Sequence, residues 1–464
     1  MKQRDLVVIG AGPAGMAAAA QAAELGLSVT ILDEQPRAGG QIYRDVDRVA
    51  PVRGGILGKD YTHGANLTAA LRQNAIEHIS GAVVWAIEDG FVVSYTRDGR
   101  GAQIAAKRIL LATGALERPM PLPGWTLPGV MTAGAGQILL KQSGVLARNA
   151  VLVGSGPLLY LIAAQMVRAG TPPTAMIETQ TRRDMIRAAP HIGGALRGWP
   201  YLMKGMGLLA EITRARVPRF TGTTDITISG QERAEAVTFT SRGRTHTIGC
   251  DTVMLHHGVV PNTQAARSLG VTHSWSVQQD CFVPDLDDWG QGSIAGVFIA
   301  GDGGGIGGAK AAEFSGRLSA LKVAEDLGSL ARSERDRQAA PLRSARSREL
   351  AVRPFLDASY PAYAGARAPV DTTVVCRCEE VTAGDIRGYA KLGCIGPNQA
   401  KAFGRAGMGP CQGRYCGTTV TALLAAANDQ TPDETGYYRI RPPLKPVTLG
   451  ELATMDDTAP EAAE

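Results

Sequence analysis

Short apolar runs, each followed by glycine or by an acidic residue, recur along the N-terminal part of the chain. Clear examples are Leu6 to Ile9, Leu27 to Leu32 and Val151 to Val153. Such runs are typical of strands in a parallel sheet, which is buried on both faces. The segments after the first and third runs are rich in Ala and Leu and predict helices. The pattern therefore predicts an α/β protein whose parallel sheets are covered by helices.

Composition and charge narrow the class of protein. A chain of 464 residues is too long for one hydrophobic core, so we expect several domains. The net charge of +5 is spread along the chain and aromatic residues make up only 5%, so no stacking surface for nucleic acid is expected. No apolar run approaches the roughly 20 residues of a membrane-spanning helix. The N-terminus enters a strand directly and does not resemble a signal peptide. We therefore expect a cytoplasmic location and leave peripheral association with the inner membrane face open.

Three glycines after the first apolar run form the pattern G-x-G-x-x-G. Gly10 permits a tight turn, Gly12 lets the backbone approach a pyrophosphate, and Gly15 lets helix and strand pack closely. The helix that begins at Pro13 and Ala14 presents unpaired N–H groups and its positive dipole end to phosphates. The strand–turn–helix order predicts a dinucleotide site, and a glycine turn without ligand is the weaker interpretation.

An acidic residue ends the second apolar run. Asp33 is placed to accept hydrogen bonds from the ribose hydroxyls of an adenosine, and Glu34 is the neighbouring alternative. This pattern alone does not separate FAD from NAD.

Two later segments carry a resemblance to a known family. Ile109 to Gly114 is an apolar run that ends in Thr113 and Gly114, and a second run from Gly296 ends in Gly301 and Asp302. The chain here resembles the two-dinucleotide flavoproteins, which include thioredoxin reductase and the pyridine nucleotide–disulfide oxidoreductases. The resemblance implies FAD, with Asp302 at its ribityl–pyrophosphate region. It also implies that Gly308 and Ala309, after Gly307, open a helix aimed at the isoalloxazine ring. A helix cap is the plainer interpretation of Asp302.

A second glycine turn is altered. Gly154 and Gly156 are present, but Leu159 replaces the third glycine, so the helix cannot approach the strand as closely there. Glu178 stands at the ribose position and would repel a 2′-phosphate, whereas Arg182 and Arg183 would attract one. We favour a retained fold without nicotinamide turnover over a working NAD(P)H site, and binding of another adenine nucleotide stays open.

Isolated cysteines and a histidine pair argue against two other kinds of chemistry. Disulfide reductases of this fold need a Cys-x-x-Cys pair beside the flavin, and Cys250 and Cys281 stand alone. The pair His256-His257 follows an apolar run, so a structural role at a strand end is favoured over metal ligation.

The seven cysteines are unevenly distributed, and five fall between residues 376 and 416. Cys376 and Cys378 form C-x-C, and Cys411 and Cys416 form C-x4-C after an intervening 32 residues. Four thiolates suit a [2Fe–2S] cluster or a structural zinc, and C-x-C is atypical of zinc. The segment resembles the iron–sulfur module of bacterioferritin-associated ferredoxins and nitrite reductases, which implies these four cysteines as [2Fe–2S] ligands. We expect Cys394 to be a buried spare thiol.

The order of these features predicts the domain organisation. A solvated, Arg-rich linker helix and a proline-rich tail that could strap across a partner flank the cysteine module, and the acidic final residues are expected to be disordered. We expect an FAD-binding domain in 1–118 and 286–326, a second dinucleotide domain in 119–285, a linker in 327–369, the [2Fe–2S] module in 370–428, and the tail in 429–464.

Two longer segments carry a narrower resemblance. Asp33 to Tyr43, which contains Gly40 and Gln41, and Met408 to Cys416 resemble the α subunits of heteromeric bacterial amine dehydrogenases. This group includes the A subunit of opine oxidase, D-hydroxyproline and dye-linked L-proline dehydrogenases, and the B subunit of hydrogen cyanide synthase. The resemblance implies that Gly40 and Gln41 help to bind FAD. It also implies a β subunit that is an FAD amine oxidase, a small third subunit, FMN at a subunit interface, and a quinone or respiratory acceptor.

These implications favour electron relay over substrate chemistry on this chain, so no catalytic acid or base is assigned. Three alternatives stay open: a stand-alone NAD(P)H-dependent FAD/iron–sulfur reductase, a glycine-oxidising subunit of the hydrogen cyanide synthase type, and a non-catalytic scaffold. The substrate amine is not defined, because its pocket would lie on another chain.

Overall fold

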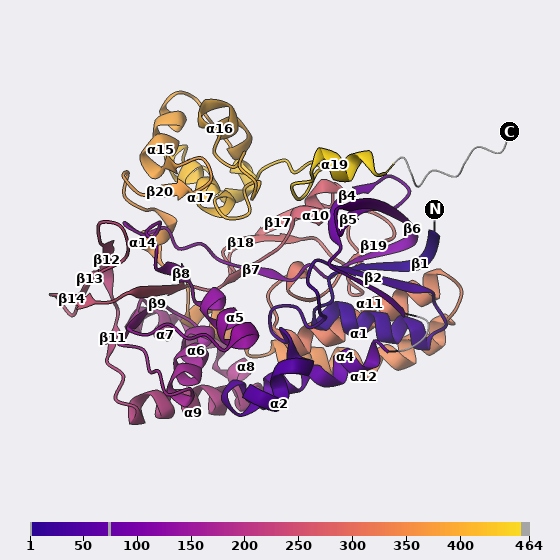
Figure 1. Cartoon of the computed structure of the whole chain (residues 1–464), viewed down its shortest axis with the longest axis horizontal. Coiled ribbons are helices and arrows are strands. Elements are labelled where there is room, and N and C mark those ends of the chain that lie inside the picture. Colours follow the sequence, from indigo (N-terminus) through magenta and orange to yellow (C-terminus); the bar gives the residue numbers. More distant parts are fainter. Residues whose placement is uncertain (1, 73–75, 456–464) are drawn as a thin grey trace.

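The computed structural model describes residues 2–72 and 76–455. Figure 1 shows two sheet-centred domains side by side, with a small helical module against one end of them. The final residues that we expected to be disordered, 456–464, lie outside the described part. No helix among the described residues is long and apolar enough to cross a membrane.

The first domain is built on a seven-stranded sheet. Its parallel strands are β3, β2, β1, β6 and β19, and the antiparallel strands β5 and β4 continue it beyond β6. The bounds are β1 (Lys2–Ile9), β2 (Val29–Asp33), β3 (Ile76–Ser80), β4 (Val83–Glu88), β5 (Val92–Arg97), β6 (Arg100–Leu111) and β19 (Val297–Ile299). Because β19 pairs with β6, a segment distant in sequence completes the sheet.

Helices α1 (Pro13–Glu24) and α11 (Ala309–Asp326) pack on each other over this sheet. Their contact is close because Gly316 lies against Ala14, where a Cβ on Gly316 would come within 2.1 Å of the Ala14 carbonyl oxygen. The short helices α2 (Val46–Leu57), α3 (Lys59–Thr62) and α4 (Gly64–Ala70) flank them. The N-termini of α1 and α11 are therefore held together at the carboxyl edge of the sheet.

The second domain has a five-stranded parallel sheet in the order β11-β10-β9-β15-β8. The remaining strands of the described chain form a three-stranded antiparallel sheet and three two-stranded sheets. The strands are β7 (Ala115–Glu117), β8 (Val130–Thr132), β9 (Ala150–Gly154), β10 (Ala175–Glu178), β11 (Arg219–Thr221), β12 (Thr224–Ser229), β13 (Ala236–Ser241), β14 (Arg244–Gly249), β15 (Thr252–His256), β16 (Val259–Pro261), β17 (His273–Ser276), β18 (Cys281–Pro284), β20 (Val374–Cys376) and β21 (Val381–Thr382).

Helices cover the second sheet, and one group of them extends away from it along an outer edge (Figure 1). They are α5 (Ala133–Ser143), α6 (Pro157–Arg168), α7 (Arg182–Ala188), α8 (Ile192–Arg197) and α9 (Trp199–Arg214), with a short 3-10 turn at Ala189–His191. Helix α10 (Gln264–Ser268) instead packs into the apolar cluster of the first domain, where a second 3-10 turn, Gly301–Gly304, follows β19.

The Arg-rich linker is helical but less solvated than its composition predicts. Helix α12 (Arg332–Leu350) packs along α11 and is followed by α13 (Arg353–Ser359) and α14 (Ala364–Arg367). Arg335 is buried and donates to Glu325 over 2.8 Å. The guanidinium groups of Arg335 and Arg343 lie 4.3 and 4.2 Å from the Trp289 ring centre. Sandwiching an indole between two cations ties the linker to the first domain.

The cysteine module contains α15 (Ala383–Lys391), α16 (Pro397–Gly404), α17 (Gly417–Ala427) and α18 (Pro432–Thr435), and the tail ends in α19 (Leu449–Ala453). The tail lies across this chain's own first domain: Leu444 donates to the Trp85 carbonyl over 2.6 Å, and Thr454 accepts from the Gly101 amide over 2.8 Å. One apolar cluster runs from Val7 and Ile9 of β1 to Leu444 of the tail. The module and the first domain therefore share a core.

Candidate cofactor sites

The first glycine turn has the close contacts that the sequence pattern predicts. A Cβ on Gly15 would lie 1.9 Å from the Gly10 carbonyl oxygen, and one on Gly10 would lie 2.4 Å from the Ala112 carbonyl oxygen. Gly12 differs, because its Cβ would meet nothing closer than the Gly40 Cα at 3.9 Å. A Cβ on Gly40 would come within 2.8 Å of the Gly12 Cα. Bare backbone at both glycines keeps a cradle open at the start of α1, next to Pro13 and Ala14.

Asp33 holds this turn in place. Its two carboxylate oxygens accept from the amides of Ala11 and Gln35 over 2.5 and 2.7 Å. Burial raises the pKa of Asp33, and the hydrogen bonds from the two backbone amides oppose that shift. Each oxygen keeps a further lone pair for a ribose hydroxyl. Glu34, the alternative, is exposed and forms a 2.9 Å ion pair with Lys445 of the tail.

The segments Thr113–Gly114 and Gly301–Asp302 lie beside each other, because β6 and β19 pair directly before them. A Cβ on Gly303 would lie 3.3 Å from Thr113 Oγ1, and one on Gly301 would lie 2.9 Å from the Ala14 Cβ. Asp302 Oδ1 accepts from the amides of Gly307 and Gly308, each over 2.9 Å. These bonds fix the loop that leads into α11, which has no side-chain cap, so Asp302 is not a helix cap. They leave Oδ2 for a ligand. Gly308 directly precedes Ala309, the first residue of α11.

Sequence reasoning missed Lys141, which comes from α5 of the second domain. Its buried ammonium donates to the Gln41 carbonyl over 3.0 Å, and burial lowers the pKa of Lys141 to about 7. The Gln41 side chain accepts from Arg44 over 3.1 Å. Two cations thus fix the loop that carries Gly40 and Gln41. A lone lysine far along the chain carries no sequence signal for this contact.

The second glycine turn keeps its backbone form but has lost its free ribose acid. Glu178 is fully buried and accepts from Tyr160 Oη over 2.6 Å, from Arg219 Nε and Nη2 over 2.6 and 2.9 Å, and from Gln180 Nε2 over 2.7 Å. The Arg219 guanidinium also lies 5.5 Å from the Tyr160 ring centre. Arg182 and Arg183, in contrast, are exposed at the start of α7. The carboxylate is committed to an internal network.

Both histidines of the pair are buried and hydrogen-bonded. His256 Nδ1 lies 2.6 Å from Glu117 Oε1. His257 Nδ1 accepts from the Tyr363 amide over 3.1 Å, which leaves Nε2–H to donate to the Pro119 carbonyl over 2.8 Å. Burial lowers the pKa of His257 to about 3, so the ring is neutral. The structural role expected for the pair is confirmed for His257, which pins the linker to the second domain.

The four module cysteines approach one another as two pairs. The Cys376 thiol lies next to that of Cys416, and the Cys378 thiol lies next to that of Cys411, and all four are free cysteines. The Cys416 contact and backbone amides, including Gly407 N at 3.4 Å, lower the pKa of Cys376 to about 6. Cys394 donates to the Gly396 carbonyl over 3.4 Å and joins neither pair. Over the described ranges, no group of three or more His, Cys, Asp or Glu is spaced to hold a metal ion. The [2Fe–2S] ligand set therefore stays a prediction.

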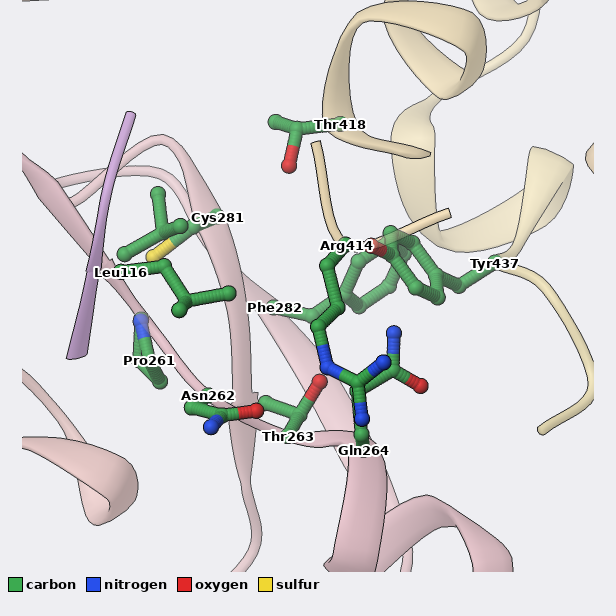
Figure 2. Close-up of a pocket in the computed structure, with 11 residues that line it drawn as sticks. Leu116, Pro261, Asn262, Thr263, Gln264, Cys281, Phe282, Arg414, Thr418 and Tyr437 are labelled. Carbon is green, nitrogen blue, oxygen red and sulfur yellow. The ribbon is translucent and has the colours of Figure 1, made fainter. Parts of the chain in front are cut away.

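A small cavity lies between the segment of residues 260–264 and the cysteine module. Figure 2 shows Asn262, Thr263 and Gln264 from one segment and Arg414 and Tyr437 from the module, with the Arg414 guanidinium beside Thr263 and Gln264. Its volume is about 20 Å³, which is room for about one water molecule. Gln264 Nε2 donates across the boundary to the Gln412 carbonyl over 3.3 Å. Thr113 Oγ1, in the predicted flavin site, donates to the Asn262 carbonyl over 2.9 Å. The segment from Asn262 to Gln264 therefore connects the predicted flavin site to Gln412, the residue after Cys411.

Comparison with known proteins assigns the two parts of the chain to two families. Residues 4–316 match the family described as pyridine nucleotide-disulphide oxidoreductase, and residues 371–455 match the sarcosine oxidase A3 domain. The A subunit of opine oxidase from Rhizobium meliloti is 43% identical over 98% of this chain and 88% of its own length. The chain belongs to the family of opine oxidase A subunits. The A3 match extends past the end predicted for the module and includes the tail that packs on the first domain.

More distant relatives show how far the likeness extends. The HcnB subunit of hydrogen cyanide synthase from Pseudomonas aeruginosa is 31% identical over 98% of this chain and 99% of its own length. The alpha subunit of sarcosine oxidase from Rhizobium meliloti is 26% identical over 97% of this chain but only 42% of its own length. The crystal structure of L-proline dehydrogenase from P. horikoshii superposes with a TM-score of 0.73 at 19% identity, over 97% of this chain and 79% of that one. At that identity the likeness shows the fold.

Proposed function

We propose that this relative of the opine oxidase A subunits is the electron-transfer α subunit of a heteromeric, flavin-dependent amine dehydrogenase in the cytoplasm. An FAD-containing β subunit of the amine-oxidase type would oxidise a secondary amine or amino acid: an opine, D-hydroxyproline or proline. This chain would pass the electrons through FAD and a [2Fe–2S] cluster to a quinone or other respiratory acceptor. Family membership over nearly the whole chain supports the class of reaction.

The observation that carries the relay role, in place of a reductase role, is the closed network around Glu178. A nicotinamide dinucleotide would need an acid there to hold its adenosine ribose. Removing the Glu178 carboxylate from Arg219 and Tyr160 would leave buried groups unpaired. Ser155 Oγ and Thr179 Oγ1 are buried without a partner among the described residues. Ser155 and Thr179, near the second glycine turn, thus keep hydroxyls that could bind a phosphate, whereas the acid that would bind the ribose is already bonded to protein groups. This leaves room for another nucleotide but disfavours NAD(P)H.

The residues of the first site fit FAD, and the four thiols of the module are donors of the type that an iron–sulfur cluster takes. The open backbone at Gly12 and Gly40 and the N-terminus of α1 would hold the FAD pyrophosphate. Asp33 would bind the adenosine ribose and Asp302 the ribityl region, while the loop at Gln41 is fixed by Lys141. The remaining residues of this site would be Pro13, Ala14, Gly10, Gly15, Thr113, Gly114, Gly301, Gly308 and Ala309, with Glu34 as the alternative ribose acid.

Four thiols on two adjacent loops suit iron, because thiolates are the ligands of [2Fe–2S] clusters. Cys376, Cys378, Cys411 and Cys416 would be the ligands, and the Gly407 amide already points at the Cys376 sulfur. When bound, FAD takes up two electrons at once and the cluster passes them on singly. This chain's own residues would bind and orient the two groups, and the Gln264–Gln412 contact joins the segment beside the first site to the loop that carries Cys411. FMN at a subunit interface and a small third subunit belong to the same proposal.

The test is a visible absorption spectrum of the chain purified alone, followed by anaerobic titration with NADH and then NADPH. The relay role predicts flavin bands with added thiolate-to-iron absorption that neither nucleotide bleaches. Rapid bleaching by either nucleotide would make the chain a reductase in its own right.

A glycine-oxidising complex of the hydrogen cyanide synthase type is the second candidate. The HcnB relatives cover the chain as completely as the opine oxidases do, at 31% against 43% identity. Assaying the assembled complex with glycine and with an opine separates the two substrate classes.

A further inference from the structure

An exposed apolar surface lies on the outer edge of the second domain, on helices α7 to α9. Trp199, Met203 and Met206 stand at positions i, i+4 and i+7 of α9 and are 61%, 54% and 55% exposed. This spacing places them in one stripe on the helix. Ile192 and Leu196 form a similar i, i+4 pair on α8, which contacts α9.

Helix α7 continues the same surface with Met185 and Ile186, the latter 73% exposed. Soluble proteins rarely leave so many large apolar side chains together in water, so the surface indicates an interaction site. The other side of α7 and α8 is not free, because α13 of the linker packs against both helices.

The charges on this surface are mostly positive, and the acid near the end of α9, Glu211, is paired with Arg168. Five cations lie between residues 182 and 206: Arg182, Arg183, Arg187, Arg197 and Lys204. The one acid in that stretch is Asp184, which is buried in the capping box at the start of α7. Lys204 is paired with Asp60 and Arg187 with Asp184. No ion pair is found for Arg182, Arg183 or Arg197 within residues 2–72 and 76–455.

These charges argue against a second copy of the chain as the occupant. A two-fold dimer brings the same surface together from both copies, so the arginines of one copy would face those of the other. The position of the surface argues against the electron-donating partner. Figure 1 places α9 at the opposite end of the second domain from the cysteine module at α15–α17. Electron transfer weakens steeply with distance, so a redox partner gains nothing by docking there.

We propose that the surface formed by α7, α8 and α9 binds the anionic face of a lipid bilayer. Helices with Trp, Met, Leu and Ile on one side and unpaired arginines beside them are typical of segments that lie in the membrane interface. Trp199 provides an exposed aromatic group that favours the headgroup level. Arg182, Arg183 and Arg197 match anionic headgroups. Docking there would leave the cysteine module facing away from the bilayer. The proposal does not depend on the cofactors.

The test is flotation of the full chain with vesicles of phosphatidylcholine alone or with added phosphatidylglycerol, at low and high salt. We expect binding to the anionic vesicles that salt weakens. The triple variant Trp199→Ser/Met203→Ser/Met206→Ser, and separately Arg182→Glu/Arg183→Glu/Arg197→Glu, should each weaken it roughly tenfold or more. Matched controls are Val277→Ser/Leu392→Ser, at exposed apolar positions elsewhere, and Arg233→Glu/Arg244→Glu. Near-ultraviolet circular dichroism checks that each variant is folded.

Two results would overturn the proposal. One is no binding to anionic vesicles at low salt, or binding that the surface variants and the controls weaken equally. The other concerns the complex with its partner subunit. If the complex does not bind vesicles, and the Trp199 variant abolishes its assembly, the surface is a protein interface. Failure of the relay role would show in the absorption spectrum and would leave vesicle binding unchanged.

Discussion

The Glu178–Arg219 pair gives the sharpest prediction, because it links stability to the absence of nicotinamide binding. Replacing Arg219 with Met removes both guanidinium hydrogen bonds and leaves a fully buried carboxylate held by Tyr160 and Gln180 alone. Stranding a buried charge in this way typically costs about 3–5 kcal/mol. We therefore expect Arg219→Met to lower the free energy of unfolding by about that amount at neutral pH.

The matched variant is Glu178→Gln/Arg219→Met, which removes the charge together with its partner. Most of the loss should be recovered, because a neutral amide can keep its bonds to Tyr160 and Gln180. The assay is the urea midpoint followed by tyrosine and tryptophan fluorescence, with flavin content measured alongside. Breaking a buried ion pair should change the free energy of unfolding by more than about 1 kcal/mol. If Arg219→Met differs from wild type by less than that, the network does not hold Glu178. Tight NADH binding by the wild type would show that Glu178 is free for ribose.

Three further predictions concern other sites. Gly15→Ala should yield protein with much less bound flavin, because its Cβ would lie 1.9 Å from the Gly10 carbonyl oxygen, whereas Gly55→Ala, with no atom within 4 Å, should keep it. Cys416→Ser should lose the iron and its thiolate-to-iron absorption, and Cys394→Ser should retain both; equal iron in the two would refute the ligand assignment. His257, with a pKa of about 3, binds a proton in the unfolded chain before the folded one, so stability should fall as pH drops from about 6.5 towards 3. His257→Gln should remove about 1.4 kcal/mol per pH unit of that slope in urea titrations, and an unchanged slope would contradict a buried neutral ring.

Much of the first domain could be predicted from sequence because its signals are local. Gly15 is required by the carbonyl of Gly10, five residues away, whereas the atom that a Cβ on Gly10 would meet belongs to the distant Ala112. Asp33 follows its strand directly, so its position near the turn follows from the parallel pairing of β1 and β2. The altered third glycine, Leu159, was likewise visible without a structure.

Contacts between distant segments could not be predicted in this way. Lys141 reaches Gln41 from another domain, and Arg219 reaches Glu178 only because β10 and β11 are neighbours. The linker was expected to be solvated from its arginines alone, yet Arg335 is buried beside Trp289. The tail was expected to strap across a partner, and the residues described instead lie on this chain's own first domain. A side chain that bonds to a residue far away in the chain leaves no periodic pattern in the sequence from which the contact could be predicted.

The most direct test of the relay role is anaerobic reduction of the complex assembled from this chain and its partner subunit. The account predicts that an opine, D-hydroxyproline or proline bleaches the flavin bands and then the iron–sulfur absorption of this chain. It also predicts that Cys416→Ser abolishes the second change and that NADH and NADPH bleach neither. Reduction by a nicotinamide nucleotide, or substrate oxidation that never reaches this chain's bands, would contradict it.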